Sequence, residues 1–433
     1  MRALRIGLCL LLAFGVLSFG AVQVWSESVL EIAAALLFLL WAVLACRSSD
    51  AKIQWNPLNW PLLGFIGIGL LQLLFHGTAY PFLTRTQLLK LAAYFLFFFL
   101  TAQAFRARED LSKLAWFVIL FCFAISLLAI IQHFTSGGEI YWIPSLETNA
   151  EPSGPYVNRN HFAGFVELTL PVGLALMAFR GVRKELFPLT TLLTIVPLSA
   201  LVLSGSRGGI ISFALEIGVL ALLVRSRRAL QGGRVAAVAL VAAVALVLVS
   251  WIGTRAIERL STLSPHDVSL DRRVSLFRGA AHIFLDHPIK GCGLGTIITV
   301  YPRYETAYDG RIVDHVHDDY IETLAETGLL GGLFGLVFLG TLYREARKNF
   351  AAEQGHFSEG LHAGAIVAIS GLLLHSFADF NLQIPANAML FLLQVFLATS
   401  PPLPSQASRQ RVNRSTSSPI SESPFVDTRG PAT

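Results

Sequence analysis

Residues 114–134 read LAWFVILFCFAISLLAIIQHF, a run without a single Asp, Glu, Lys or Arg. About 20 apolar residues are enough for a helix to cross the hydrocarbon core of a bilayer, so the run is predicted to be a transmembrane helix. Further long apolar runs, several with one or two charged residues, recur at 5–24, 28–46, 58–76, 86–105, 160–179, 187–204, 208–224, 235–253, 320–343, 360–379 and 384–399. The pattern therefore predicts an all-α polytopic membrane protein with about twelve transmembrane helices.

The composition agrees with a chain that lies mostly in lipid. The 433 residues are 54% hydrophobic and 14% charged, whereas soluble domains carry about 25% charged residues. The net charge of +5 does not indicate a nucleic-acid partner, because the basic residues are divided among loops and form no single patch. Of the four cysteines, only Cys292 lies outside an apolar run, so neither a disulfide framework nor a zinc site is indicated.

The N-terminal segment sets the orientation. Its basic end and apolar stretch resemble a cleaved signal peptide, but no small-residue cleavage motif follows, so we interpret it as the first transmembrane helix. When the N-terminus is placed in the cytoplasm, every cytoplasmic segment holds at least two Lys or Arg residues. This satisfies the positive-inside rule, and an even number of helices returns the C-terminus to the cytoplasm.

The chain divides into four parts by composition. Residues 1–253 are predicted to form transmembrane helices 1–9, residues 254–318 a large periplasmic loop with an amphipathic helix, and residues 319–399 helices 10–12. The remainder, 400–433, is rich in Pro and Ser and is predicted to be a disordered cytoplasmic tail. No internal repeat is evident, so an inverted-repeat transporter is not supported.

The predicted outer loop is unusually basic. It keeps eight basic residues on the side of the membrane where they are disfavoured. These are Arg255, Arg259, Arg272, Arg273, Arg278, Lys290, Arg303 and Arg311. Either a long translocated loop simply escapes the rule, or an anionic ligand binds at the outer membrane surface, and the count leaves both explanations open.

Two short polar turns open predicted spans on the same outer face. In the stretch SGSRGG at 204–209, Ser204 or Ser206 can cap the next helix, so that free backbone N–H groups and Arg207 lie at its start. Such a helix start is a natural phosphate site, although an arginine that snorkels to the interface fits as well. The stretch NRNH at 158–161 repeats the arrangement, and it also fits a simple polar cap.

The third cluster is DRRVSLFR at 271–278. In the segment 272–286, apolar residues fall near one helical face: Val274, Phe277, Ile283 and Phe284. This predicts an amphipathic helix that lies at the membrane surface. The stretch GCGLG at 291–295 predicts a turn and does not match a phosphate-binding fingerprint.

The fourth cluster is DHVHDDY at 314–320, with Glu322 and Glu326 following at helical spacing. A histidine beside carboxylates is a plausible general base. His315 and His317 with the neighbouring aspartates also fit a metal site, and the same residues fit a plain polar boundary. All four clusters fall on the outer side of the predicted topology, so a basic surface and a candidate base share one face.

Four stretches of this sequence resemble the bacterial O-antigen ligase and O-antigen polymerase family. They are GPYVNRNHFAG at 154–164, SRGG at 206–209, the HVHDDY run at 315–320 that continues to AETG at 325–328, and HSFADFNLQIPAN at 375–387. The resemblance covers roughly residues 150–395. It implies a GT-C-like membrane glycosyltransferase that needs no metal or other cofactor.

The resemblance also implies substrates and a location. The donor would be a glycan on undecaprenyl diphosphate, and the acceptor a hydroxyl of lipid A core or of another glycan. The reaction would take place at the periplasmic face of the bacterial inner membrane, with lipid bilayer around the protein and no nucleic acid involved.

Site residues carry over from the same resemblance. Arg207 and Arg273 would hold the diphosphate, with Arg272 or Arg278 as stand-ins because Phe277 replaces the family's frequent Trp, and His317 would face the acceptor. Asp318 stands where Asn is commoner in the family. Further substrate contacts are expected from Arg159, His161, His315, Asp318, Tyr320 and Glu326.

Other functions remain open at this point. Within the family, a polymerase of O-antigen or exopolysaccharide, or an enzyme that attaches glycan to protein, would carry the same motifs. A transporter of lipid-linked glycan would need charged residues near the middle of the bilayer, where Glu167 and Glu216 are the main acids. A metal-dependent hydrolase would rest on His315, His317 and the aspartates beside them.

Overall fold

The computed structural model describes residues 1–48, 52–144, 153–227, 268–306 and 310–402. Over these ranges the regular structure is helical, apart from two isolated β-bridges. The long helices are α1 (Arg2–Leu17), α2 (Val24–Cys46), α3 (Asn59–Leu74), α4 (Pro81–Ala104), α5 (Arg108–Thr135), α6 (Arg159–Ala178), α7 (Phe187–Leu203), α8 (Arg207–Ser226), α10 (Val268–Asp286), α12 (Asp319–Ala352), α13 (His356–His375) and α14 (Pro385–Thr399).

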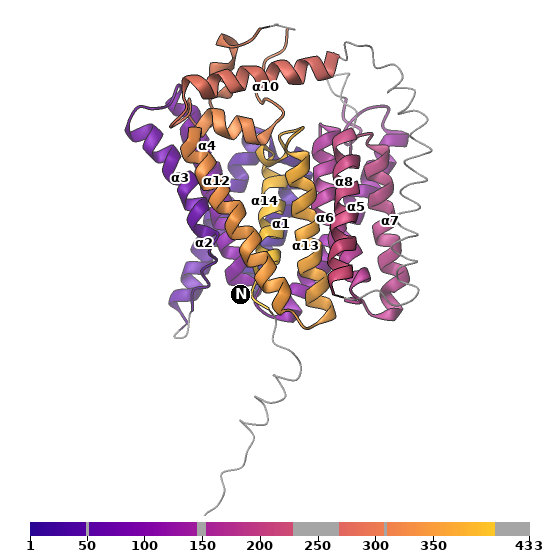
Figure 1. Cartoon of the computed structure of the whole chain (residues 1–433). Coiled ribbons are helices and arrows are strands. Elements are labelled where there is room, and N and C mark those ends of the chain that lie inside the picture. Colours follow the sequence, from indigo (N-terminus) through magenta and orange to yellow (C-terminus); the bar gives the residue numbers. More distant parts are fainter. Residues whose placement is uncertain (49–51, 145–152, 228–267, 307–309, 403–433) are drawn as a thin grey trace, which may run out of the picture.

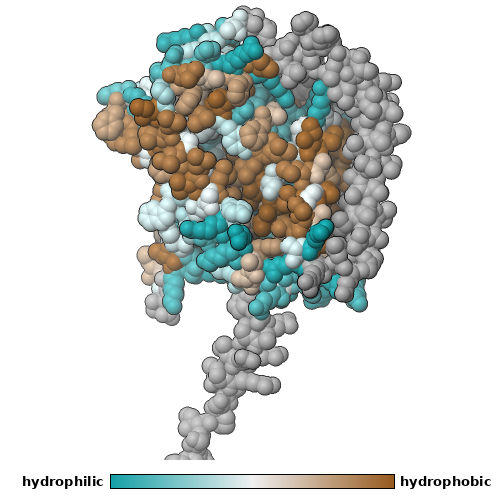
Figure 2. All heavy atoms as spheres, in the orientation of Figure 1, coloured by the Kyte–Doolittle hydropathy of each residue, from teal (hydrophilic) through white to brown (hydrophobic). Residues whose placement is uncertain are grey.

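Eight of the described helices are long and apolar enough to cross a membrane, and α3 and α14 are shorter apolar helices. Figure 2 shows the corresponding surface, where a hydrophobic band lies between hydrophilic ends. The predicted all-α class is thus confirmed for the described residues. The count of twelve stays a prediction, because the expected span at 235–253 lies outside them, as do Arg255, Arg259 and the tail from 403.

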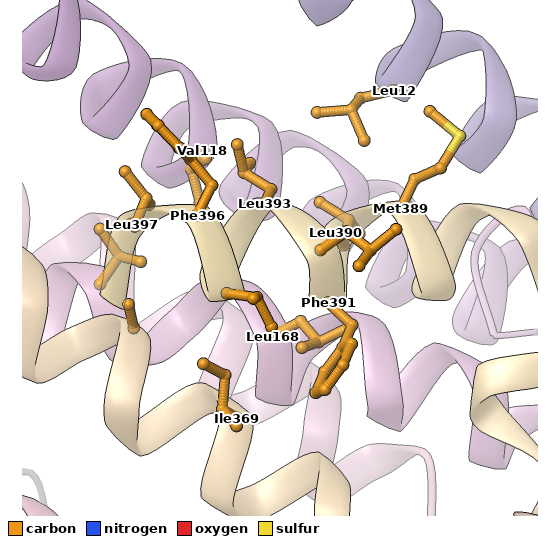
Figure 3. Packing of buried hydrophobic residues seen from close by; sticks show 14 of the residues in the cluster. Leu12, Val118, Leu168, Ile369, Met389, Leu390, Phe391, Leu393, Phe396 and Leu397 are labelled. Atoms are coloured by element: carbon orange, nitrogen blue, oxygen red, sulfur yellow. The ribbon is translucent and has the colours of Figure 1, made fainter. Parts of the chain in front are cut away.

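The centre of the bundle is formed by α6, α13 and α14. All of α6 is buried except its first turn, and every residue of α14 is buried. Figure 3 shows how α14 packs against four partners, with Leu12 of α1, Val118 of α5, Leu168 of α6 and Ile369 of α13 around it. Because lipid is as apolar as these side chains, close packing rather than exclusion from water holds the helices together.

Glycines let α13 lie directly against α6. A Cβ on Gly360 would come within 3.0 Å of Leu176 Cα, and one on Gly364 within 2.8 Å of Val172 Cα. Small residues four positions apart are a usual means of bringing two membrane helices into backbone contact. The close approach places the last turn of α13 beside the first turns of α6.

One end of the bundle carries the motif residues. In Figure 1, α10 lies across this end, while the N-terminus lies at the opposite end. Helices α6, α8 and α12 begin at the end covered by α10, and α13 ends there. We call it the α10 end.

The predicted amphipathic helix corresponds to α10. Of its predicted apolar residues, Ile283 is buried with Leu276 and Ala280 in a small separate cluster, whereas Val274 and Phe277 are 41% and 47% exposed. The helix therefore packs on the protein through one side and leaves Val274 and Phe277 on its open side. That this open side lies on the membrane surface stays a prediction.

Helix α12 is interrupted at Gly328, which has φ +63°. The segment 288–293 fills the gap with main-chain hydrogen bonds: Cys292 N–H to Ala325 O, Gly293 N–H to Glu326 O, Leu329 N–H to Pro288 O and Leu330 N–H to Ile289 O. The predicted turn at 291–295 is confirmed, with Gly291, Gly293 and Gly295 all at positive φ. The loop after α10 is thereby attached to the start of α12.

Candidate functional site

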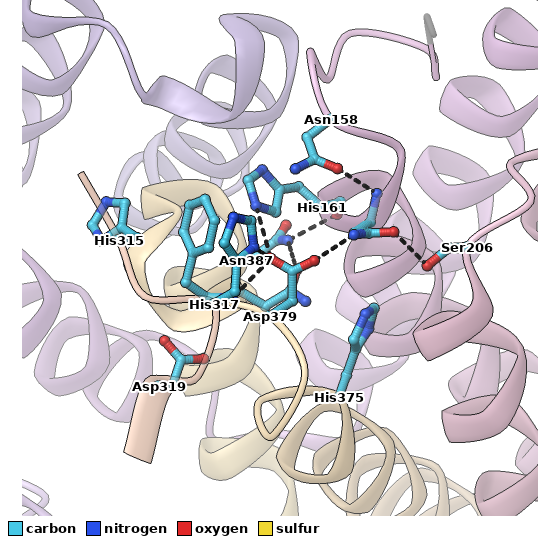
Figure 4. A network of polar contacts seen from close by, with 12 residues as sticks. Asn158, His161, Ser206, His315, His317, Asp319, His375, Asp379 and Asn387 are labelled. Atoms are coloured by element: carbon cyan, nitrogen blue, oxygen red, sulfur yellow. Dashed lines mark hydrogen bonds and ion pairs between the residues drawn. The ribbon is translucent and has the colours of Figure 1, made fainter. Parts of the chain in front are cut away.

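A single buried carboxylate, that of Asp379, lies at the centre of the polar residues at the α10 end. It follows α13 and is 0% exposed. Its Oδ1 lies 3.4 Å from His317 Nδ1 and 3.6 Å from His161 Nε2, and its Oδ2 accepts a hydrogen bond from the Asn160 amide. Figure 4 shows these groups converging on Asp379 from different segments.

The surroundings of Asp379 favour its ionised form. Burial by itself raises the pKa of this carboxyl, but His161 and His317 outweigh the burial and hold the pKa well below its ordinary value. An ionised carboxylate beside an imidazole orients the ring and stabilises the imidazolium when the ring takes up a proton. His317 and Asp379 therefore have the arrangement of a base with its orienting acid.

The backbone at His317 is strained. Its φ is +57°, a conformation that non-glycine residues rarely adopt and that persists only where the surroundings impose it. Just before it, the Val316 N–H donates to Glu322 Oε2 over 2.8 Å, and just after it, Asp318 caps α12. The two anchors turn Nδ1 of His317 inward and leave the Nε2 edge of a 31% exposed side chain facing outward.

Three histidines surround the ring of Phe380. The centroid of that ring lies 4.7 Å from His161, 4.5 Å from His315 and 4.8 Å from His317. His315 is held by Glu322 at 2.7 Å; burial lowers the pKa of His315, but Glu322 raises it more, so it lies above its ordinary value. Phe380 thus lies between the rings, of which His161 and His317 face Asp379 and His315 faces Glu322.

The first turn of α8 joins the same network. Ser206 caps this helix by accepting from Gly209 N–H at 3.1 Å, as the sequence predicted, and its hydroxyl donates to Asn160 Oδ1 at 2.9 Å. Asn160 in turn donates to Asp379. Hydrogen bonds from Ser206 to Asn160 and from Asn160 to Asp379 therefore connect the residue before Arg207 with the His317–Asp379 pair.

The last stretch of the predicted motifs forms the floor beneath these residues. The Asn387 side chain accepts from Tyr156 Oη at 2.8 Å and donates to the His161 carbonyl at 2.9 Å. It also donates to Asn381 Oδ1 at 3.0 Å, an oxygen that lies only 2.2 Å from the place of a Cβ on Gly164. A larger residue at Gly164 would therefore displace Asn381.

The arginines expected to bind the donor lie on two sides of this centre. Arg207 is exposed at the start of α8, and Arg159 is half-buried at the start of α6. Arg273 on α10 is close enough for its charge to act on His375 at the end of α13. Arg272 acts instead on Tyr301, and Arg278 is exposed further along α10.

Three expected substrate contacts have other partners. Asp318 accepts from the N–H groups of Tyr320 and Ile321 and so acts as a helix cap; burial raises its pKa. The Tyr320 hydroxyl donates to Leu373 O at 2.6 Å. Glu326 accepts from Ile297 N–H at 3.3 Å and thereby fastens the glycine-rich turn.

The chemistry available here is proton transfer beside cationic groups. The two histidines of the 314–320 cluster contact different carboxylates, His315 with Glu322 and His317 with Asp379. Within the described parts of the chain, no group of three His, Cys, Asp or Glu residues is arranged to hold a metal ion. The arrangement suits a base that takes a proton from a hydroxyl next to an anion held by arginines.

Sequence reasoning missed the carboxylate at the centre. Asp379 lay inside the quoted 375–387 stretch but was not singled out, and neither were Asn160, Phe380 and His375. Asp379 carries a usable signal, since it is the last residue of the predicted run at 360–379, and an acid within a transmembrane run is costly unless it is paired. Its partners, however, lie more than 60 and 200 positions away in the chain, which no local pattern reveals.

Comparison with known proteins bears on this geometry. Residues 192–336 match a family model described as O-Antigen ligase. The matched part includes the start of α8 with Arg207, α10 with Arg273, and the His317 turn with the beginning of α12. No curated protein matches the chain.

Proposed function

Taking the chain as a member of the O-antigen ligase and polymerase family, which the match over residues 192–336 supports, we propose that it is a membrane glycosyltransferase of the ligase type. It moves a glycan from undecaprenyl diphosphate to an acceptor hydroxyl at the α10 end of the bundle. The observation that carries the proposal is the His317 ring, held by a buried, ionised Asp379.

His317 is the base in this reaction. The acceptor oxygen attacks C1 of the sugar, and its proton passes to His317 Nε2, the ring edge that faces outward. Asp379 stabilises the imidazolium that forms. The distance of 3.4 Å between His317 Nδ1 and Asp379 Oδ1 is that of an ion pair whose hydrogen bond is not yet formed, which suits a resting state, since catalytic hydrogen bonds tighten when substrate is bound.

Arg207 and Arg273 hold the leaving group. As the bond between C1 and the diphosphate oxygen breaks, negative charge grows on the diphosphate, and fixed guanidinium groups stabilise this charge. Arg207 stands at a helix start, where the backbone N–H groups add to the same effect. The reaction proceeds without a metal in this scheme.

Lipid A core is the acceptor in a ligase, and a second carrier-linked glycan is the acceptor in a polymerase. The two reactions share the roles of His317, Arg207 and Arg273 and differ in the acceptor, which the following experiment identifies.

The test is glycan transfer in proteoliposomes that contain purified protein, undecaprenyl-diphosphate glycan and one acceptor at a time. His317→Gln, Arg207→Ala and Arg273→Ala are expected to lose transfer, each by about a hundredfold or more. Arg303→Ala, which removes an exposed charge from the same end of the protein, serves as the control.

Each other outcome points elsewhere. Transfer to carrier-linked glycan would make the protein a polymerase, and loss of transfer in EDTA would contradict the metal-independent mechanism. Movement of the glycolipid across the bilayer with no transfer to any acceptor would identify a transporter instead.

A further inference from the structure

A second histidine–carboxylate pair lies beside the proposed site and has no part in the mechanism above. His375, the last residue of α13, is 2% exposed, and Glu167 on α6 is fully buried. His375 Nδ1 lies 3.0 Å and 3.2 Å from the two carboxylate oxygens of Glu167. A carboxylate at Nδ1 fixes the orientation of the ring and turns Nε2 the other way.

Nε2 of His375 points at the first turn of α8. A Cβ on Gly208 would lie 2.6 Å from this nitrogen, so glycine at this position leaves the nitrogen its space. Among the residues that the structure describes, none forms a hydrogen bond with Nε2. Figure 4 shows His375 on the Ser206 side of Asp379, apart from the rings around Phe380.

The His375 side chain is 1% exposed, and its Nε2 edge faces the first turn of α8, so a group that enters at this turn can reach the nitrogen. The groups around it favour an anion: the Ser206 cap leaves N–H groups of the α8 start directed outward, Arg207 stands next to Gly208, and the charge of Arg273 acts on the ring. A helix start with an imidazole beneath it and arginines beside it is a binding site for phosphate oxygens.

Carboxylates of three different segments lie around His375. Glu167 contacts the ring from α6, and Asp379 lies on the loop that follows α13. Glu216 of α8 lies one turn further in, against Gly371, and neither of its carboxylate oxygens has a partner within the described ranges. When protonated, His375 can donate from Nε2 while Nδ1 stays on Glu167.

We propose that His375 is a second catalytic histidine. Its Nε2 contacts the donor's diphosphate at the first turn of α8, beside Arg207, and gives the diphosphate a proton as the diphosphate leaves. The inference rests on the proposed glycosyl transfer. When the bond between C1 and the diphosphate oxygen breaks, its electron pair stays on that oxygen, and the Nε2 proton of His375 moves to the diphosphate. The acceptor's proton has meanwhile gone to His317, and exchange with solvent restores both rings.

Binding and turnover are measured on the same preparations of protein in nanodiscs. The binding probe is undecaprenyl diphosphate without glycan, so that this measurement needs no acceptor. His375→Gln is expected to raise the Kd about tenfold, the effect of one lost charged hydrogen bond, and to lower kcat about a hundredfold. Glu167→Gln, which leaves the ring in place without its carboxylate, is expected to lower kcat with a smaller change in Kd.

Two further variants keep the test informative if His375→Gln folds poorly. Gly208→Ala places a methyl group against Nε2, which displaces the ring or blocks this nitrogen, and is expected to weaken diphosphate binding although the imidazole is still present. His362→Gln is the matched control, because His362 is also buried on α13 but bonds to Ser358 and Ser400 at the other end of that helix.

The outcomes separate this inference from the proposed function. If wild type transfers glycan and both His375→Gln and Gly208→Ala bind and turn over as wild type does, the role of His375 is overturned. If wild type binds the diphosphate lipid through His375 but transfers glycan to no acceptor, the phosphate site stands and the glycosyltransferase proposal fails.

Discussion

Replacing Asp379 with Asn tests the centre of the site, because the change removes one charge and almost no volume. At the 3.4 Å that separates Asp379 from His317, Coulomb's law with an effective dielectric constant of about 20 gives about 5 kcal/mol for the interaction with an imidazolium. His317 is 31% exposed, so solvent screens part of this energy. We expect about 3 kcal/mol of transition-state stabilisation to be lost, which is a roughly hundredfold fall in kcat.

The assay is single-turnover glycan transfer, with the melting temperature measured on the same sample. Asp314→Asn is the matched control: it makes the same chemical change three residues from His317, where the carboxylate is exposed and accepts from the His315 N–H. If Asp379→Asn stays within threefold of wild type while folded, Asp379 does not support a base at His317.

The pKa of Asp379 adds a test against pH. Burial raises this pKa, but His161 and His317 lower it more, so it lies well below its ordinary value. A carboxyl with a depressed folded-state pKa stabilises the fold above about pH 4, and this stabilisation is lost as the pH falls towards the folded-state value. The loss on acidification should be weaker in Asp379→Asn.

Three further predictions concern single residues. The raised pKa of His315, for which Glu322 outweighs burial, means that its stabilisation is present below about pH 6.5 and lost as the pH rises; the melting temperature should fall from pH 6 to 8 more in wild type than in His315→Gln, and equal slopes would contradict this. Gly328→Ala should cost about 1–3 kcal/mol by thermal unfolding, whereas Gly340→Ala, with open space around it, should not. Asp318→Ala should cost about 1 kcal/mol and Asp318→Asn little, and a loss of transfer in a stable Asp318→Asn would instead reveal a substrate contact.

The helical part of the fold could be predicted because its signal is local. The run at 160–179 became α6 (Arg159–Ala178), and the run at 187–204 became α7 (Phe187–Leu203). Each apolar run carries enough information to define its own helix. The packing of the helices could not be predicted in this way. Helices α6 and α13 meet through glycines of α13, and the need for glycine at these positions depends on the position of α6.

Individual residues of the site could be predicted from the sequence, whereas the contacts between them could not. His317 and Ser206 stand at helix starts that the sequence announces, and Ser206 caps α8 as expected. Asp318 and Glu326 were expected to contact substrate because of the family resemblance, and that expectation stays a prediction. The structure shows both bonded to backbone N–H groups. Which N–H groups at helix ends and turns need an acceptor depends on the folded backbone, so the residue types alone did not reveal these contacts.

The interruption of α12 at Gly328 has a consequence for how this chain can vary. The loop at 288–293 is held there by main-chain hydrogen bonds, to which Pro288 and Ile289 contribute only carbonyl groups, so their side chains are free to vary. Gly291 and Gly293 are not, because both have positive φ and a Cβ on Gly291 would meet the backbone of Glu326. A deletion or insertion within 288–293 would break the register of four hydrogen bonds at once. Homologues of this chain should therefore vary at Pro288 and Ile289 but keep the two glycines and the length of this segment.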